Sequence, residues 1–238
     1  YLADVTINSG CTIPLGSSPT SSGGLITNNG AITLSGATWT LNASYTQNNG
    51  ASLTMTSTTT WDINDRASTA SAPGNLTLSG GTLTASSLTT LNLQGSLDNT
   101  GNLLPNSLAV TLDGADSGDD ATLTCGTVTF ASVSISKTNY LADVTINSGC
   151  TIPLGSSPTS SGGVITNNGA ITLSGATWTL NASYTQNAGA SLTMTSTTTW
   201  DINDRASTAS VPGNLTLSGG TLTASSLTTL NLQGSLDN

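Results

Sequence analysis

Short runs of alternating apolar and polar residues recur along the whole chain. The alternation is strict in residues 32–34, 53–55, 83–85 and 128–130, where each second residue is apolar. A period of two predicts short β-strands that bury one face. Threonine fills many of the polar positions, and its branched side chain suits the exposed face of a pleated strand.

Turn signals separate these runs at fairly regular intervals. Short, mostly polar motifs end in glycine at Gly10, Gly30, Gly50, Gly80, Gly101, Gly126 and Gly149. Asparagine and glycine both tolerate the positive φ angles of tight turns. Two or three short strands in each interval predict one coil of a β-solenoid.

A near-identical repeat relates the two halves of the sequence. Residues 1–99 recur as residues 140–238. The two copies differ at three positions: Leu25 and Val164, Asn49 and Ala188, Ala72 and Val211. We therefore divide the chain into one full period, residues 1–139, and a partial second period, residues 140–238, that continues the same solenoid. We also expect the chain to be a window from a longer tandem array.

The predicted fold is an all-β, right-handed parallel β-helix of about ten coils, with about 20–25 residues per coil. Six coils per period would advance the axis by roughly 29 Å at about 4.8 Å per coil. A β-propeller blade needs about 40–45 residues, twice the observed spacing. An immunoglobulin-like sandwich does not explain why the turn motifs recur at short intervals inside the period.

Three stretches carry a family resemblance: residues 26–43 (ITNNGAITLSGATWTLNA), 75–91 (NLTLSGGTLTASSLTTL) and 91–103 (LNLQGSLDNTGNL). They are similar to coils of filamentous-haemagglutinin and autotransporter-type β-helices of bacterial surface proteins, and the resemblance extends over essentially all 238 residues. It implies a secreted, elongated rod displayed at the cell surface. It brings no catalytic motif that can be transferred to this chain.

The composition excludes several classes of function. The chain has three basic residues, twelve acidic residues that are all aspartate, no histidine and a net charge of −9. Three cations cannot follow a phosphate backbone, so no nucleic-acid partner is expected. The apolar runs are too short for membrane insertion. The chain lacks the mixed acids, bases and nucleophiles of an active site, so we predict that it is not an enzyme.

The three cysteines occupy two positions of the repeat. Cys11 and Cys150 are equivalent, and Cys125 precedes Cys150 by about one coil. Neighbouring coils bring Cα atoms within disulfide range. We predict a Cys125–Cys150 disulfide, a single Cys11 and an oxidising, extracellular or cell-surface location. The alternative is that all three are buried free thiols.

The longest spacing, between Gly50 and Gly80, predicts a loop that projects from the rod. An aspartate–arginine group occupies this loop in both copies: Asp62, Asp65, Arg66, Asp201, Asp204 and Arg205. We consider three roles for it: a solvated loop, a lateral contact between neighbouring rods, and the paired carboxylates of a polysaccharide-cleaving enzyme. A lateral contact is the functional role that we predict.

Four carboxylates lie close together in the sequence: Asp113, Asp116, Asp119 and Asp120. Oxygen ligands in a flexible acidic loop are typical of Ca²⁺ sites, so these residues are candidate calcium ligands. Their spacing matches neither the EF-hand nor the nonapeptide calcium repeat, and aspartate with glycine also forms ordinary turns. Apart from calcium, no cofactor is expected.

Tryptophans and threonines suggest two further ligands. Trp39 and Trp61, repeated as Trp178 and Trp200, would form a carbohydrate-binding platform if they were exposed, but their alternation with Leu41 favours a place in the core. Rows of Thr-x-Thr suit ice binding only if they stack in register, and their offsets from the turn glycines argue against that.

These observations favour a structural tandem-repeat unit of an extracellular fibre, sheath or surface array, which self-associates by stacking coils end to end and packing laterally. One alternative is an adhesin stalk whose binding tip lies outside this sequence. A second is a secreted carbohydrate-active β-helix.

Overall fold

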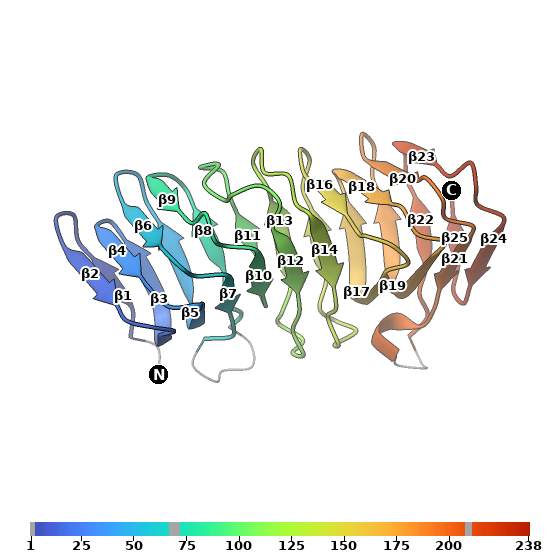
Figure 1. The fold of residues 1–238 in the computed structure, drawn as a ribbon. Helices are drawn as coiled ribbons and strands as arrows, with labels where there is room; N and C mark the ends of the chain where they lie inside the picture. The colour runs from blue at the N-terminus through green and yellow to red at the C-terminus, as the bar shows by residue number, and fades with distance from the viewer. Residues whose placement is uncertain (1–2, 67–71, 208–210) are drawn as a thin grey trace.

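The computed structural model describes residues 3–66, 72–207 and 211–238. It is an all-β parallel solenoid of about eleven coils with about 21 residues per turn. Its strands follow one another along a single axis from the N-terminal to the C-terminal end (Figure 1). The predicted fold class is confirmed, with about eleven coils in place of about ten.

Each coil has up to three strands, which stack into three faces. Faces 1 and 2 belong to one 17-stranded parallel sheet, and face 3 consists of two separate four-stranded sheets. Four long strands bend partway and serve faces 1 and 2 in turn: β3 (Thr20–Asn28), β5 (Thr38–Gln47), β17 (Thr159–Asn167) and β19 (Thr177–Gln186).

The remaining strands of face 1 are β7 (Thr60–Ile63), β10 (Thr90–Leu93), β12 (Ala109–Leu112), β14 (Ser132–Ile135), β21 (Thr199–Ile202) and β24 (Thr229–Leu232). Those of face 2 are β1 (Val5–Ile7), β8 (Leu76–Leu78), β11 (Leu97–Asp98), β13 (Ala121–Thr124), β15 (Val144–Ile146), β22 (Leu215–Leu217) and β25 (Leu236–Asp237). Face 3 holds β2 (Thr12–Leu15), β4 (Ala31–Leu34), β6 (Ser52–Met55) and β9 (Thr82–Thr84), then β16 (Thr151–Pro153), β18 (Ala170–Leu173), β20 (Ser191–Met194) and β23 (Thr221–Thr223). A 3₁₀ turn, η1 (Arg205–Ser207), lies in the second projecting loop.

The core is a column of apolar side chains inside the coils. Trp39 and Trp61 are fully buried and stack with their ring centroids 5.2 Å apart. Tyr45 packs edge-on against both rings, and Trp178, Trp200 and Tyr184 repeat the arrangement. Because these tryptophans are buried, they fill the core and cannot form a carbohydrate platform on the surface.

Buried amides hold the corner between faces 2 and 3. Asn28 Nδ2 donates to Tyr45 Oη at 3.1 Å and to the Ser52 carbonyl at 3.0 Å, and its Oδ1 accepts from Gly30 N at 3.0 Å. Gly50 forms the next turn at this corner with a φ of 82°. The asparagines near these turns therefore satisfy buried backbone groups on neighbouring coils, in addition to favouring the turn.

The second repeat copy continues the first without a break. On face 2, Leu97 pairs with Leu123, Leu123 pairs with Ile146, and Ile146 pairs with Asn167. Face 3 is interrupted at this junction, because none of the described residues between β9 and β16 forms a strand in its two sheets. The coils between β9 and β16 are therefore joined by ladders on faces 1 and 2 alone, and β14 is joined to β17 on face 1 by a single bridge between Ser136 and Ser161.

Candidate functional site

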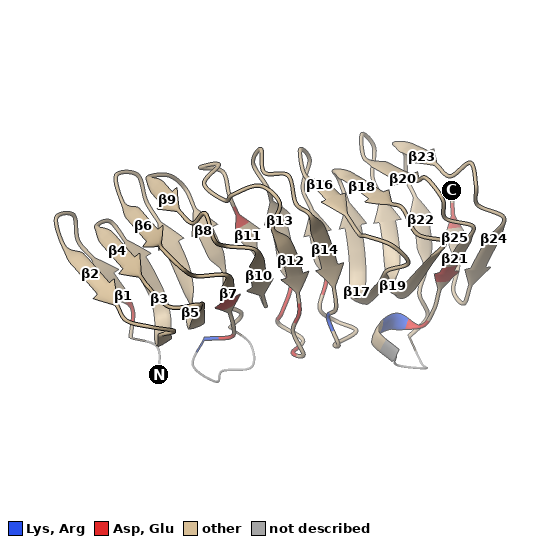
Figure 2. Cartoon of the chain, viewed as in Figure 1, with Lys and Arg blue, Asp and Glu red and all other residues tan. Residues whose placement is uncertain are grey.

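Most charged residues lie at the corner where face 1 turns into face 2, which we call the charged corner (Figure 2). Eleven of the fifteen charged residues lie there: Asp4, Asp65, Arg66, Asp113, Asp116, Asp119, Asp120, Lys137, Asp143, Asp204 and Arg205. The other four lie in strands of faces 1 and 2. Among the described residues, the strands of face 3 carry no charge. The charged corner is therefore the chemically distinctive part of the rod.

The first loop that is predicted to project follows β7, and its residues 67–71 lie outside the described residues. Asp62 lies in β7, and its Oδ1 accepts a hydrogen bond from Asn92 Nδ2 at 2.6 Å. Asp65 lies in the loop, where its backbone N–H donates to Gln94 Oε1 at 2.5 Å. Arg66 N donates to the Ala72 carbonyl at 2.9 Å. Both aspartates are thus bound to the next coil of the same chain.

The second loop repeats this arrangement. Asp201 Oδ1 accepts from Asn231 Nδ2, and Asp204 N donates to Gln233 Oε1, both at 2.5 Å. Arg205 N donates to the Val211 carbonyl at 2.8 Å. The prediction that Asp62 and Asp201 belong to the loops is wrong, because both lie in strands of face 1, where their alternation with buried apolar residues places them. The other four residues follow these strands at the charged corner. Their role in lateral contacts stays a prediction, because the structure holds one chain.

The acidic loop after β12 does not gather its four aspartates into one set. Asp119 is fully buried, and its Oδ2 accepts from Asp116 N at 2.9 Å. Asp120 Oδ1 instead accepts from Asp143 N at 2.8 Å on the next coil. Gly114, with a φ of 141°, leaves room for the Asp119 carboxylate, since a Cβ at this position would clash with it.

The carboxylates that do converge are those of Asp65, Asp116 and Asp119, which offer oxygens that all lie within 4.8 Å of one another. Asp65 follows β7 and the other two follow β12, so the cluster connects coils two apart. Asp113 and Asp120 of the predicted calcium set are not part of it. Burial, followed by the charges of Asp119 and Asp116, raises the pKa of Asp65 to about 7.

Lys137 is fully buried and interacts electrostatically with Asp119 and Asp65 of this cluster. Its Nζ donates to the carbonyls of Gln94 and Asp113, each at 2.5 Å. Burial lowers the pKa of Lys137 to about 8, although Asp119 and Asp113 favour its charged form. The pKa of Asp113 is raised, chiefly by burial. The sequence did not predict Lys137 as part of a site. It is the one lysine of the sequence, and nothing in its neighbouring residues indicates that its side chain contacts Gln94 and Asp113 on preceding coils.

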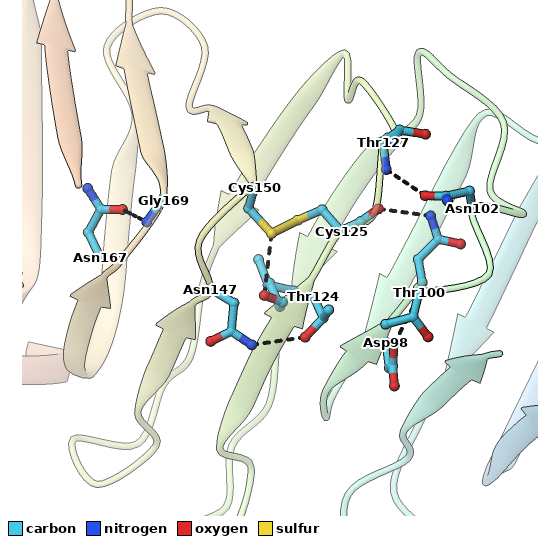
Figure 3. The surroundings of a disulfide bond; sticks show 12 residues. Asp98, Thr100, Asn102, Thr124, Cys125, Thr127, Asn147, Cys150, Asn167 and Gly169 are labelled. Atoms are coloured by element: carbon cyan, nitrogen blue, oxygen red, sulfur yellow. Dashed lines mark hydrogen bonds between the residues drawn. A yellow bond between two sulfur atoms is a disulfide. The ribbon is translucent and has the colours of Figure 1, made fainter. Parts of the chain in front are cut away.

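A disulfide connects neighbouring coils at the corner between faces 2 and 3 (Figure 3). It joins Cys125 to Cys150 with the Cα atoms 5.2 Å apart, which confirms the predicted pairing. Cys11 is a free, exposed thiol. Asn99 Nδ2 donates to the Cys125 carbonyl at 2.9 Å, and Asn147 Nδ2 donates to Thr124 Oγ1 at 2.9 Å, so polar ladders flank the bridge.

Each end of the solenoid exposes part of its apolar core. A cavity of about 290 Å³ at the N-terminal end is lined mainly by Val5, Ile7, Ile13, Leu15 and Ile26. At the C-terminal end, the exposed apolar residues are Leu222, Leu230 and Leu236.

Comparison with protein-family models, with curated proteins and with solved structures finds no match. In the described part of the chain, no helix has the length and apolar character that a membrane span requires.

Proposed function

We propose that this chain is a structural tandem-repeat unit of an extracellular fibre, sheath or surface array, in which coils stack end to end and rods pack side by side. Near-identical copies add length along one axis, which is what a fibre requires.

The observation that carries the proposal is the continuous ladder across the copy junction. β13, β15 and β17 pair in parallel from the first copy into the second. No linker separates the copies, so each further copy would extend the same axis by about 29 Å. A chain of independent domains would instead show a boundary with few crossing contacts.

Equivalent positions in the two copies show how much apolar surface one coil buries on the next. Val5 is 47 % exposed, whereas the equivalent Val144 inside the rod is 1 % exposed. Leu236 is 56 % exposed, whereas the equivalent Leu97 is 1 % exposed. The two residues of each pair occupy the same repeat position, so the difference in their exposed fractions shows how much of the side chain a neighbouring coil covers. Burying such side chains is worth about 1.5–3 kcal/mol each.

Two features support an extracellular location. A disulfide persists in oxidising compartments and is rare in reducing ones. The coils also resemble filamentous-haemagglutinin and autotransporter-type β-helices, which belong to secreted surface rods. Lateral packing would use the uncharged face 3 and the projecting loops, which stand on different sides of each coil.

The test is to follow assembly of the purified chain by electron microscopy and sedimentation. A Cys11→Ala variant removes disulfide-linked dimers, and Leu236→Asp with Val5→Asp places charges on the two exposed ends. We expect filaments that lengthen with protein concentration, and we expect the charged variant to stop at single rods of about 53 Å, or eleven coils. Single rods of the unmodified chain at all concentrations would reject the fibre and favour the adhesin stalk.

A further inference from the structure

The projecting loop and the acidic loop meet at one point of the charged corner. Asp65 follows β7, Asp116 and Asp119 follow β12, and the short turn after β10 passes between them. Gln94 of that turn accepts from Asp65 N through its side chain and from Lys137 Nζ through its carbonyl. Residues of four consecutive coils are therefore connected at this point.

We propose that the carboxylates of Asp65, Asp116 and Asp119 bind one Ca²⁺ ion, which ties the projecting loop to the coil two steps further along the rod. The proposal is independent of the fibre function, because it concerns a site within one chain.

The geometry matches the size of this ion. Ca²⁺ binds oxygens at about 2.3–2.6 Å, so two of its ligands can lie up to about 5 Å apart. The oxygens of the three carboxylates lie within 4.8 Å of one another. The donor set is oxygen only, which suits a hard cation. Water or carbonyl oxygens would complete the six to eight ligands that Ca²⁺ takes.

A buried oxygen without a partner points to a ligand independently of the cluster. Asp119 is fully buried, and its Oδ1 has no hydrogen-bond partner, whereas its Oδ2 is held by Asp116 N. Asp65 Oδ1 is also buried without a partner. A buried carboxylate oxygen that receives no hydrogen bond is costly unless a proton or a cation satisfies it.

The local charge balance leaves a deficit that a divalent cation would reduce. Lys137 is fully buried, and its Nζ is already directed at two carbonyls. Together with Arg66 it supplies two positive charges against the five carboxylates of Asp65, Asp113, Asp116, Asp119 and Asp120.

The second copy provides a matched control. Asp204 occupies the repeat position of Asp65, but this chain has no counterparts of Asp116 and Asp119 two coils beyond it. Asp204→Asn therefore makes the same chemical change as Asp65→Asn without touching the proposed site.

The experiment is calorimetric titration of the 238-residue chain with CaCl₂, together with thermal unfolding in EDTA and in an excess of CaCl₂. We expect one Ca²⁺ per chain and a rise in Tm of roughly 3–10 °C, if the Kd lies at about 0.1–1 mM and CaCl₂ is present at about 10 mM. Asp65→Asn and Asp119→Asn should each abolish both signals, and Asp204→Asn should keep both. Circular dichroism in EDTA checks that each variant is folded.

Three results would overturn the proposal. One is the absence of binding and of any Tm shift in the unmodified chain at the same excess of CaCl₂. Another is binding that survives in folded Asp65→Asn and Asp119→Asn, which would place the ion elsewhere. The third is an equal response to MgCl₂, which would reject calcium as the ligand, because Mg²⁺ demands nearly ideal octahedral geometry at about 2.0–2.1 Å.

Discussion

Removing the Cys125–Cys150 disulfide should loosen the centre of the rod. The bridge lies where face 3 has no strands, so the coils on either side are joined by fewer ladder hydrogen bonds. The perturbation is the double variant Cys125→Ala with Cys150→Ala. We choose alanine over serine because both cysteine side chains are only 2 % exposed, and serine would bury a hydroxyl group there. Cys11→Ala is the control, because Cys11 shares the repeat position of Cys150 but is free and exposed.

The size of the effect follows from the loop that the bridge closes. For a sequence separation of 25 residues, the chain-entropy model gives about 3.5 kcal/mol at 25 °C. For a chain of this length, a loss of that size corresponds to a fall in Tm of roughly 7–14 °C. Since solenoid stability is a sum over neighbouring coils, the effect should be concentrated near the bridge.

Hydrogen exchange followed by mass spectrometry measures this directly. Peptides within residues 97–154 should exchange faster in the double variant, and peptides within residues 31–63 should change little. Urea unfolding followed by tryptophan fluorescence gives the total loss, because one stacked pair lies on each side of the bridge. Equal exchange and equal urea midpoints in the double variant and in Cys11→Ala would refute the reasoning.

Two further predictions use equivalent positions and ionisable groups. Leu91→Ala should lower the free energy of unfolding by about 2–5 kcal/mol. Leu230→Ala, at the same repeat position, should lower it by less than half of that, because the Leu91 side chain is 0 % exposed and the Leu230 side chain is 41 % exposed. Similar urea midpoints for the two variants would contradict this. In EDTA, stability should rise between pH 8 and 10 as the buried Lys137 loses its proton, since its pKa is lowered to about 8 when folded. Above pH 10 stability should fall, because burial raises the pKa of Tyr45 and Tyr184, so that only the unfolded chain ionises them readily. Urea midpoints between pH 7 and 11 check both trends, and Lys137→Met should remove the rise and keep the fall.

The repeat and the two-residue alternation were sufficient to predict the coils. Each strand needs only its own alternating residues and a turn at its end, so the information is local. The disulfide was also predictable, because two cysteines one coil apart must lie near each other once the coils stack. The predicted number of coils, about ten, is slightly lower than the observed number of about eleven, because the turn glycines mark the coils only indirectly.

The cluster formed by the carboxylates of Asp65, Asp116 and Asp119 was not predictable from the sequence. Asp65 and Asp119 lie two coils apart along the chain, and their approach depends on the short turn at Gln94 between them. The acidic stretch alone suggested four ligands from one loop, of which only Asp116 and Asp119 converge. Similarly, the polar motif that ends at Gly30 predicts only a turn at Asn28. The structure shows that the Asn28 amide also forms hydrogen bonds with Tyr45, Ser52 and Gly30 inside the corner between faces 2 and 3.

The concentration of charge at one corner gives the rod an electrostatic polarity across its width. Within residues 1–139, the charged corner holds six aspartates and two basic residues, a net charge of −4. Four of the six aspartates lie within residues 113–120, so the negative charge is concentrated once per period of about 29 Å, several times the screening length of about 8 Å at physiological salt. The corner therefore carries separate negative patches along the rod, while the strands of face 3 are uncharged. If rods pack side by side as we propose, contacts near these patches would be opposed by repulsion, so bundling should increase with ionic strength and with calcium.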